Sequence, residues 1–254
     1  MLESYIHSRL EEKKILLMTH IVIGYPSLDA SLEIVRTMVE AGVDLMELQI
    51  PFSEPIADGP VILKASQDAL ANGVTVPQCL EFGRTVARRF SIPFLYMTYY
   101  NILFKYGVDR FAEHMQNAGL KGAIVPDLPP EEAGDYLTAM QRRGLSPIFI
   151  FSPTTSAARM QTIATVADGF VYCVARKGVT GDQTRFSRQM DEYLGACRQA
   201  TGLPLALGFG VKDREDIQFL EGKADIAVIG TQALRLMDSE GIDALGPFVR
   251  NLQT

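Results

Sequence analysis

The hydrophobic pattern of the chain repeats every ~30 residues: a short apolar run, then a loop, then a stretch with helical periodicity. Apolar, β-branched runs predict eight strands, at 15–23, 44–50, 93–99, 122–127, 146–152, 169–175, 203–209 and 225–231. Helical periodicity predicts helices between them, at 27–42, 61–72, 78–90, 107–119, 129–144, 155–166, 188–201 and 213–221. Further helices are expected at 1–13, after Gly230 and near 240–252.

Eight βα repeats in 254 residues are the content of a (β/α)₈ barrel. The alternative is an open doubly wound sheet, which alternates in the same way. The barrel is favoured because the count closes at eight and no G-x-G-x-x-G follows the first predicted strand. We predict an α/β fold, a single (β/α)₈ TIM barrel with an extra N-terminal helix, in which residues 1–254 form one domain.

Glu47 is the first candidate for chemistry, because it is an acid inside an apolar strand, DLMELQI (44–50). Alternation along a strand puts Leu45, Glu47 and Gln49 on one face and three apolar residues on the other. The outer face of a barrel strand packs on helices and is apolar, so the face with Glu47 points into the barrel. Burial favours a protonated carboxyl, which suits a general acid. The structural alternative is a glutamate held by hydrogen bonds in the core.

Asp58 lies in the loop after this strand, within SEPIADGP (53–60). Because Pro60 suits the first turn of a helix, Asp58 could simply cap the helix that follows. The other interpretation is a second carboxylate that works with Glu47. Two cooperating carboxyls need different protonation states, and the strand position suits the donor while the loop position suits the ionised partner.

Glycine turns follow three consecutive predicted strands: GVTG (178–181), GFG (208–210) and Gly230-Thr231, where a short helix starts. Glycines let backbone N–H groups approach an anion, and a helix N-terminus favours negative charge. Loops after the seventh and eighth strands are a frequent phosphate site in barrels. The sequence therefore predicts a ligand that carries a phosphate.

Three further features are open to two interpretations each. The polar, glycine-hinged segment at 175–187 is either a closing lid or a solvated loop. Tyr172, on the sixth predicted strand, is either core packing or a phenol at the barrel mouth. Asp127 ends the fourth predicted strand, where capping a helix is the alternative to a binding role.

Composition excludes several classes of function. The net charge of −6 gives no basic footprint for nucleic acid, and no apolar run is long enough to cross a membrane. Three scattered cysteines and an N-terminus without a signal peptide predict a cytoplasmic protein. The three histidines lack metal-ligand spacing, so no metal is expected. No lysine ends a strand as a Schiff base would need, so carbon–carbon cleavage would depend on carboxyl acid–base chemistry.

Six segments together resemble the tryptophan synthase alpha subunit family: MELQIPFSEPIADGP (46–60), MTYYNILFKYG (97–107), IVPDLPPEE (124–132), SPTT (152–155), ARKGVTG (175–181) and LGFG (207–210). The resemblance implies a phosphate-binding barrel that splits indole-3-glycerol phosphate into indole and glyceraldehyde 3-phosphate. It also implies an α₂β₂ complex, in which indole passes to a beta subunit that uses pyridoxal phosphate. The pyridoxal phosphate then belongs to the partner, and this chain needs no cofactor.

The resemblance also implies roles for single residues. Glu47 matches the general acid–base of the family, Asp58 the acid that holds the indole N–H, and Tyr172 a tyrosine of the pocket. Substrate contacts are expected from His20, Tyr99, Asp127 and Thr180, and phosphate contacts from Gly181, Gly208, Gly210, Gly230 and Thr231. The chain departs from the family pattern at His20, where an aromatic residue is common, and at Tyr25 and Glu54.

Two other functions stay open on the sequence alone. One is a stand-alone lyase that releases free indole. The other is a non-catalytic barrel that only binds and regulates a partner, although the presence of both Glu47 and Asp58 argues against it.

Overall fold

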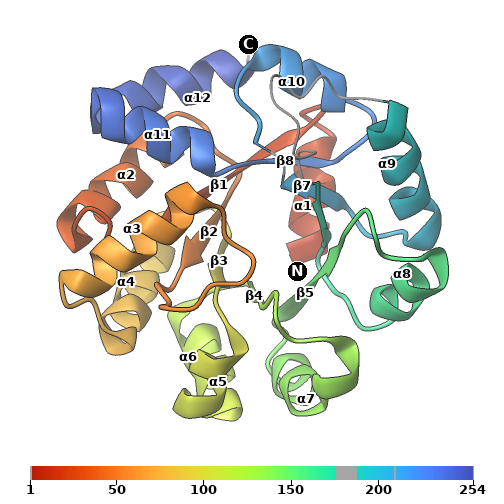
Figure 1. Ribbon diagram of the computed structural model, residues 1–254, viewed down its shortest axis with the longest axis horizontal. Helices are drawn as coiled ribbons and strands as arrows, with labels where there is room; N and C mark the ends of the chain where they lie inside the picture. The colour runs from red at the N-terminus through yellow and green to blue at the C-terminus, as the bar shows by residue number, and fades with distance from the viewer. Residues whose placement is uncertain (1, 176–187, 209, 254) are drawn as a thin grey trace.

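The computed structural model describes residues 2–175, 188–208 and 210–253. Its strands are β1 (Leu16–Val22), β2 (Leu45–Gln49), β3 (Phe94–Met97), β4 (Gly122–Ile124), β5 (Ser146–Phe151), β6 (Val171–Val174), β7 (Leu205–Gly208) and β8 (Ile226–Ile229). Each strand pairs in parallel with the next, and β8 pairs with β1, so the sheet is a closed barrel (Figure 1). The predicted (β/α)₈ barrel is confirmed, and the open sheet is wrong.

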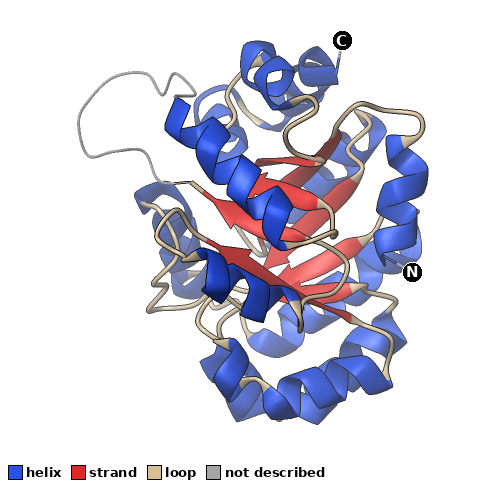
Figure 2. Cartoon of the chain, turned by 90° about the vertical axis from the view of Figure 1, so that its right-hand side faces the viewer, coloured by secondary structure: helices blue, strands red, loops and turns tan. Residues whose placement is uncertain are grey.

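Helices surround the barrel on all sides, and the strands cross the centre of the molecule inside them (Figures 1 and 2). They are α1 (Leu2–Leu10), α2 (Leu28–Glu40), α3 (Pro60–Ala71), α4 (Val76–Arg89), α5 (Tyr100–Tyr106), α6 (Val108–Ala118), α7 (Gly134–Arg142), α8 (Ala157–Ala164), α9 (Arg188–Ala200), α10 (Arg214–Leu220), α11 (Thr231–Glu240) and α12 (Leu245–Gln253). Two 3₁₀ turns, η1 (Pro130–Glu132) and η2 (Ile242–Ala244), precede α7 and α12.

Two helical predictions differ from the structure. α5 was not predicted, because its seven residues, YNILFKY, are too few to show helical periodicity. The helix predicted at 129–144 is two elements, since the tandem prolines support only the 3₁₀ turn η1 and α7 begins after Ala133. Ser27 caps α2: its hydroxyl accepts a hydrogen bond from the N–H of Ala30 at 3.1 Å.

Alternation along the strands builds two separate apolar layers. The outer layer packs strand residues such as Met46 and Leu48 against the ring of helices. The inner layer holds the opposite residues, Leu45 among them, together with Leu2 and Ile6 of α1. The extra N-terminal helix therefore covers one end of the barrel interior, which leaves the other end for a site.

Asp44, which precedes β2, binds Arg9 of α1 and Lys13 after it to the barrel. Its carboxylate is 1% exposed and accepts hydrogen bonds from Lys13 Nζ at 2.8 and 2.9 Å. It also accepts from Arg9 at 3.1 Å and from the N–H of Leu17 at 3.0 Å. We expect Asp44→Ala to lower the free energy of unfolding by about 1–3 kcal/mol, because the buried N–H of Leu17 and the two partly buried cations lose their acceptor. Urea unfolding measures this, and a loss no larger than that of the exposed-site variant Asp243→Ala would contradict it.

Within the described part of the chain, no helix combines enough length with enough apolar character to span a lipid bilayer.

Candidate active site

Glu47 lies inside the barrel, as its position in the strand pattern predicts, and is 2% exposed. The parallel register of β1 and β2 places His20 directly beside it. His20 Nδ1 lies 3.0 Å from Glu47 Oε1, and both side chains are buried. The register therefore brings an imidazole and a carboxyl into contact although they lie far apart in the sequence.

Tyr172 reaches the same carboxyl from the far wall of the barrel. Its hydroxyl, on β6, donates to Glu47 Oε1 at 3.3 Å. Burial and then the charge of Glu47 raise the pKa of Tyr172 well above 10, so the phenol stays neutral and keeps its proton to donate. Gly208, at the end of β7, makes room for the ring, since a Cβ there would lie 2.3 Å from Tyr172 Cε1.

Asp58 is half-buried, and its Oδ2 accepts a hydrogen bond of 2.7 Å from Gln49 Nε2. The capping interpretation is wrong, because Gly59 is the N-cap of α3 and no side chain caps that helix. Burial raises the pKa of Asp58, although the charge of His20 and hydrogen bonds from Gln49 and Tyr99 act in the opposite direction. The surroundings of Asp58 are thus partly buried, and the loop brings Asp58 to the strand that carries Glu47.

Tyr99 orders the loop that carries Asp58. Its hydroxyl accepts a hydrogen bond of 3.2 Å from the N–H of Ala57 and is also hydrogen-bonded to Asp58. Phe52 stacks on its ring, with centroids 5.1 Å apart. Tyr99 therefore acts on the site through the loop, and its contact with the substrate stays a prediction.

Asp127 hydrogen-bonds the start of a helix, but not of the helix that follows it in the chain. Its Oδ1 accepts a hydrogen bond of 2.8 Å from the N–H of Tyr100, the first residue of α5. It thus satisfies a free N–H at the start of a neighbouring helix. Its assignment to substrate binding stays a prediction.

The glycine turns after β7 and β8 lie beside the carboxyl site. Gly230, the N-cap residue of α11, packs against His20, since a Cβ there would lie 3.3 Å from His20 Cβ. Thr231 opens α11, so the N-terminus of that helix is adjacent to the site. Gly210 has a φ of +50°, a left-handed conformation that favours glycine. Thr180 and Gly181 lie outside the described residues, as does all of the 175–187 segment except Ala175.

Gln49 lies inside the barrel, as its strand position predicts, and its part in the site was not predicted. Gln49 Nε2 donates to Asp58 and lies 3.3 Å from the hydroxyl of Ser66 on α3. The signal for Gln49 was available, because it shares a strand face with Glu47. Ser66 carried no signal, since a serine in a helix is common.

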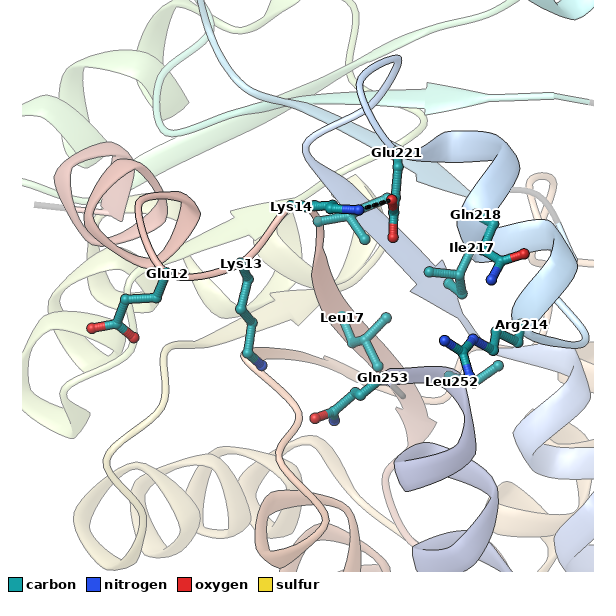
Figure 3. A pocket seen from close by; sticks show the side chains of 11 residues that line it. Glu12, Lys13, Lys14, Leu17, Arg214, Ile217, Gln218, Glu221, Leu252 and Gln253 are labelled. Atoms are coloured by element: carbon teal, nitrogen blue, oxygen red, sulfur yellow. Dashed lines mark hydrogen bonds and ion pairs between the residues drawn. The ribbon is translucent and has the colours of Figure 1, made fainter.

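A cavity of about 370 Å³ lies away from this site (Figure 3). Its lining includes Lys14 before β1, Arg214 and Glu221 at the two ends of α10, and Gln253 at the end of α12. It therefore opens at the amino ends of the strands, whereas barrel enzymes place their chemistry at the carboxyl ends. In the described ranges there is also no group of three or more His, Cys, Asp or Glu side chains that could hold a metal ion.

His20 makes stability depend on pH. Burial lowers the pKa of His20, but the charge and hydrogen bond of Glu47, with the charge of Asp58, outweigh it and raise the pKa above 6.5. A raised folded-state pKa contributes stability that is fully present below 6.5 and lost as pH rises through the folded-state value. We therefore expect His20→Asn to lower the free energy of unfolding more at pH 6 than at pH 9. Urea unfolding at both pH values tests this, and an equal loss at the two would contradict it.

Comparison with known proteins places this geometry in context. The family described as "Tryptophan synthase alpha chain" matches residues 6–245. The tryptophan synthase alpha chain of Syntrophotalea carbinolica is 66% identical over 253 residues, covering 100% of both chains. That of Desulforapulum autotrophicum is 62% identical over 252 residues, covering 99% of this chain and 100% of the relative.

Solved structures agree with the sequence relatives. The tryptophan synthase structure from Mycobacterium tuberculosis has a TM-score of 0.92 at 30% identity, covering 99% of this chain and 96% of that chain. A tryptophan synthase complex from Pyrococcus furiosus has a TM-score of 0.86 at 27% identity, covering 93% of this chain and 97% of that chain.

Proposed function

The chain belongs to the tryptophan synthase alpha chain family, and from this we propose how its own residues divide the work of the reaction. It is a lyase that cleaves indole-3-glycerol phosphate to indole and glyceraldehyde 3-phosphate, and it acts with a beta subunit that uses the indole to make tryptophan. We propose that pyridoxal phosphate belongs to the beta subunit and that the alpha chain works with side chains and backbone groups alone.

The proposal depends mainly on one observation: Glu47 is buried with one oxygen hydrogen-bonded and the other available. Oε1 accepts from Tyr172 and lies within hydrogen-bond distance of His20 Nδ1, whereas Oε2 has no hydrogen-bond partner among the described residues. Buried polar atoms are normally hydrogen-bonded, so an unpaired carboxyl oxygen in a barrel mouth suits contact with a substrate.

In the proposed reaction, Glu47 gives its proton to the indole carbon that carries the glycerol phosphate chain. This turns the ring into an iminium that can accept the electron pair of the breaking carbon–carbon bond. The Glu47 carboxylate then takes the proton of the adjacent hydroxyl as that carbon becomes the aldehyde, so the carboxyl is restored. The substrate ring serves as the electron sink, and neither a Schiff-base lysine nor a metal is required.

Asp58 is proposed to bind the indole N–H and to stabilise the positive charge that forms on the ring. The bonds from Gln49 and Tyr99 hold its carboxylate in place before the charge develops, which is the arrangement that electrostatic catalysis needs. Glu47 as donor and Asp58 as ionised partner then have the different protonation states that the reaction demands.

The phosphate is proposed to bind at the turns after β7 and β8, through backbone N–H groups near Gly208, Gly210 and Gly230 and the hydroxyl of Thr231. The start of α11 adds a favourable dipole for an anion. Because Gly230 packs against His20, a phosphate at this turn would leave the indole end of the substrate next to Glu47.

A surface for the beta subunit is suggested by two large apolar side chains. Ile56 is 72% exposed and Phe104 71% exposed. Ile56 precedes Asp58 by two positions in the loop between β2 and α3, so a partner that covers it would contact the loop of the active site. Burying these two side chains against a partner would remove apolar surface from water, which favours association.

The test is a steady-state assay of indole release from indole-3-glycerol phosphate, with and without the beta subunit. We expect turnover that rises strongly when the beta subunit is added. High unaided turnover without stimulation would support the stand-alone lyase instead. Activation of the beta subunit without any cleavage would support the non-catalytic partner.

A further inference from the structure

The two hydrogen bonds to Glu47 converge on one oxygen. His20 Nδ1 lies 3.0 Å and the Tyr172 hydroxyl 3.3 Å from Oε1, while Oε2 has no partner within the described part of the chain. Burial lowers the pKa of His20, but Glu47 raises it overall, so the 3.0 Å contact favours the form in which Nδ1 carries a hydrogen and donates it to Oε1, beside the hydrogen bond from Tyr172.

We propose that His20 is a positioning residue that acts through Glu47: its Nδ1–H on Oε1 directs the acidic proton to Oε2, the oxygen that faces the substrate. This rests on the proposed function, in which Glu47 is the proton donor. It assigns to His20 a role distinct from the substrate contact expected from the sequence.

The physical reason is that an oxygen with two donors has little capacity left for a proton of its own. Protonating Oε1 would break or reverse one of these hydrogen bonds, which is unfavourable for a buried pair. The same two donors stabilise the carboxylate that remains after Glu47 has given its proton away. The carboxyl is thereby held in one orientation through both proton transfers.

His20 Nδ1 lies 3.0 Å from Glu47, and a hydrogen bond with the Gln49 side chain also contributes to the raised pKa of His20. Gln49 and Asp58 face it from β2 and the loop after β2, and the charge of Asp58 acts at a distance. Gly230 presents only backbone from the turn after β8. His20 is 4% exposed, so solvent competes little for Nδ1.

Two amide substitutions separate positioning from proton transfer by His20. In His20→Asn the amide nitrogen stands two bonds beyond Cβ, as Nδ1 does, so it can donate to Oε1 without carrying a titratable proton. In His20→Gln the same amide lies one bond further out and overlays Nε2 instead. His20→Phe removes the donor altogether, and His114→Phe is the matched control, because His114 is hydrogen-bonded to the carbonyl of Leu80 on α4, outside the site.

The assay is kcat and KM for indole-3-glycerol phosphate cleavage in the complex with the beta subunit. We expect His20→Phe and His20→Gln to lower kcat by ~10–100-fold with KM changed less than about threefold, the size of effect that follows from misplacing a catalytic group. His20→Asn should recover most of that loss, and His114→Phe should match the wild type. A residue that merely forms the pocket wall would change KM instead.

Each other outcome overturns the inference. Wild-type kcat in His20→Phe would show that Oε1 does not need the donor, and equal loss in His20→Asn and His20→Gln would show that the imidazole itself transfers the proton. If His20→Phe does not fold, the comparison of Asn with Gln decides alone. Assaying Glu47→Gln in parallel separates the proposed function from the positioning role of His20. An active Glu47→Gln variant refutes the proposed function. An inactive Glu47→Gln variant together with a fully active His20→Phe variant refutes only the positioning role.

Discussion

Replacing Glu47 by glutamine is expected to lower kcat for indole formation by ~10²–10⁴-fold, the usual contribution of a general acid. The amide cannot donate a proton of comparable acidity to the indole carbon. The fold should persist, because glutamine has the same shape and its carbonyl oxygen can still accept from His20 and Tyr172. The loss therefore reports chemistry and not unfolding.

The measurement is steady-state indole release by the purified variant in the presence of the beta subunit, together with thermal unfolding. Glu33→Gln is a suitable control, since Glu33 is an exposed glutamate on α2. Turnover of the Glu47 variant close to that of the control would remove Glu47 from the mechanism.

The second large effect is expected at Asp58. Asp58→Asn should lower kcat by roughly 10²-fold, the scale at which one preorganised electrostatic group acts in catalysis. Asparagine keeps an oxygen for the 2.7 Å hydrogen bond from Gln49, so the loop should stay in place. The negative charge that stabilises the iminium ring is lost.

This effect is distinguished from a loop disturbance by a second variant. Tyr99→Phe removes the hydroxyl that binds the N–H of Ala57 and the carboxylate of Asp58, but it keeps the charge. We expect Tyr99→Phe to lower kcat less than Asp58→Asn does. If Tyr99→Phe costs as much as Asp58→Asn, then the order of the loop, and not the charge, accounts for the loss.

Much of the fold could be predicted from the pattern of the chain. The eight strands and the ring of long helices follow from periodicities of two and about 3.6 residues, which local sequence displays directly. α5 was missed because a helix of seven residues is too short to display such a periodicity. The division of 129–144 into η1 and α7 was missed because the end of a helix depends on backbone angles near tandem prolines that a pattern does not resolve.

The sequence by itself determined which residues face inward, because alternation along a strand is a local property: Glu47 and Gln49 share a face whatever the strand pairs with. Only the tertiary structure decided which side chains meet there. Barrel register puts His20 beside Glu47 across 27 positions, and barrel closure brings Tyr172 to the same oxygen across 125 positions. The tertiary structure also decided that the Asp58 carboxylate accepts a hydrogen bond from Gln49 and does not cap α3. Such contacts depend on how strands far apart in the chain are aligned and closed, and no local pattern contains that alignment.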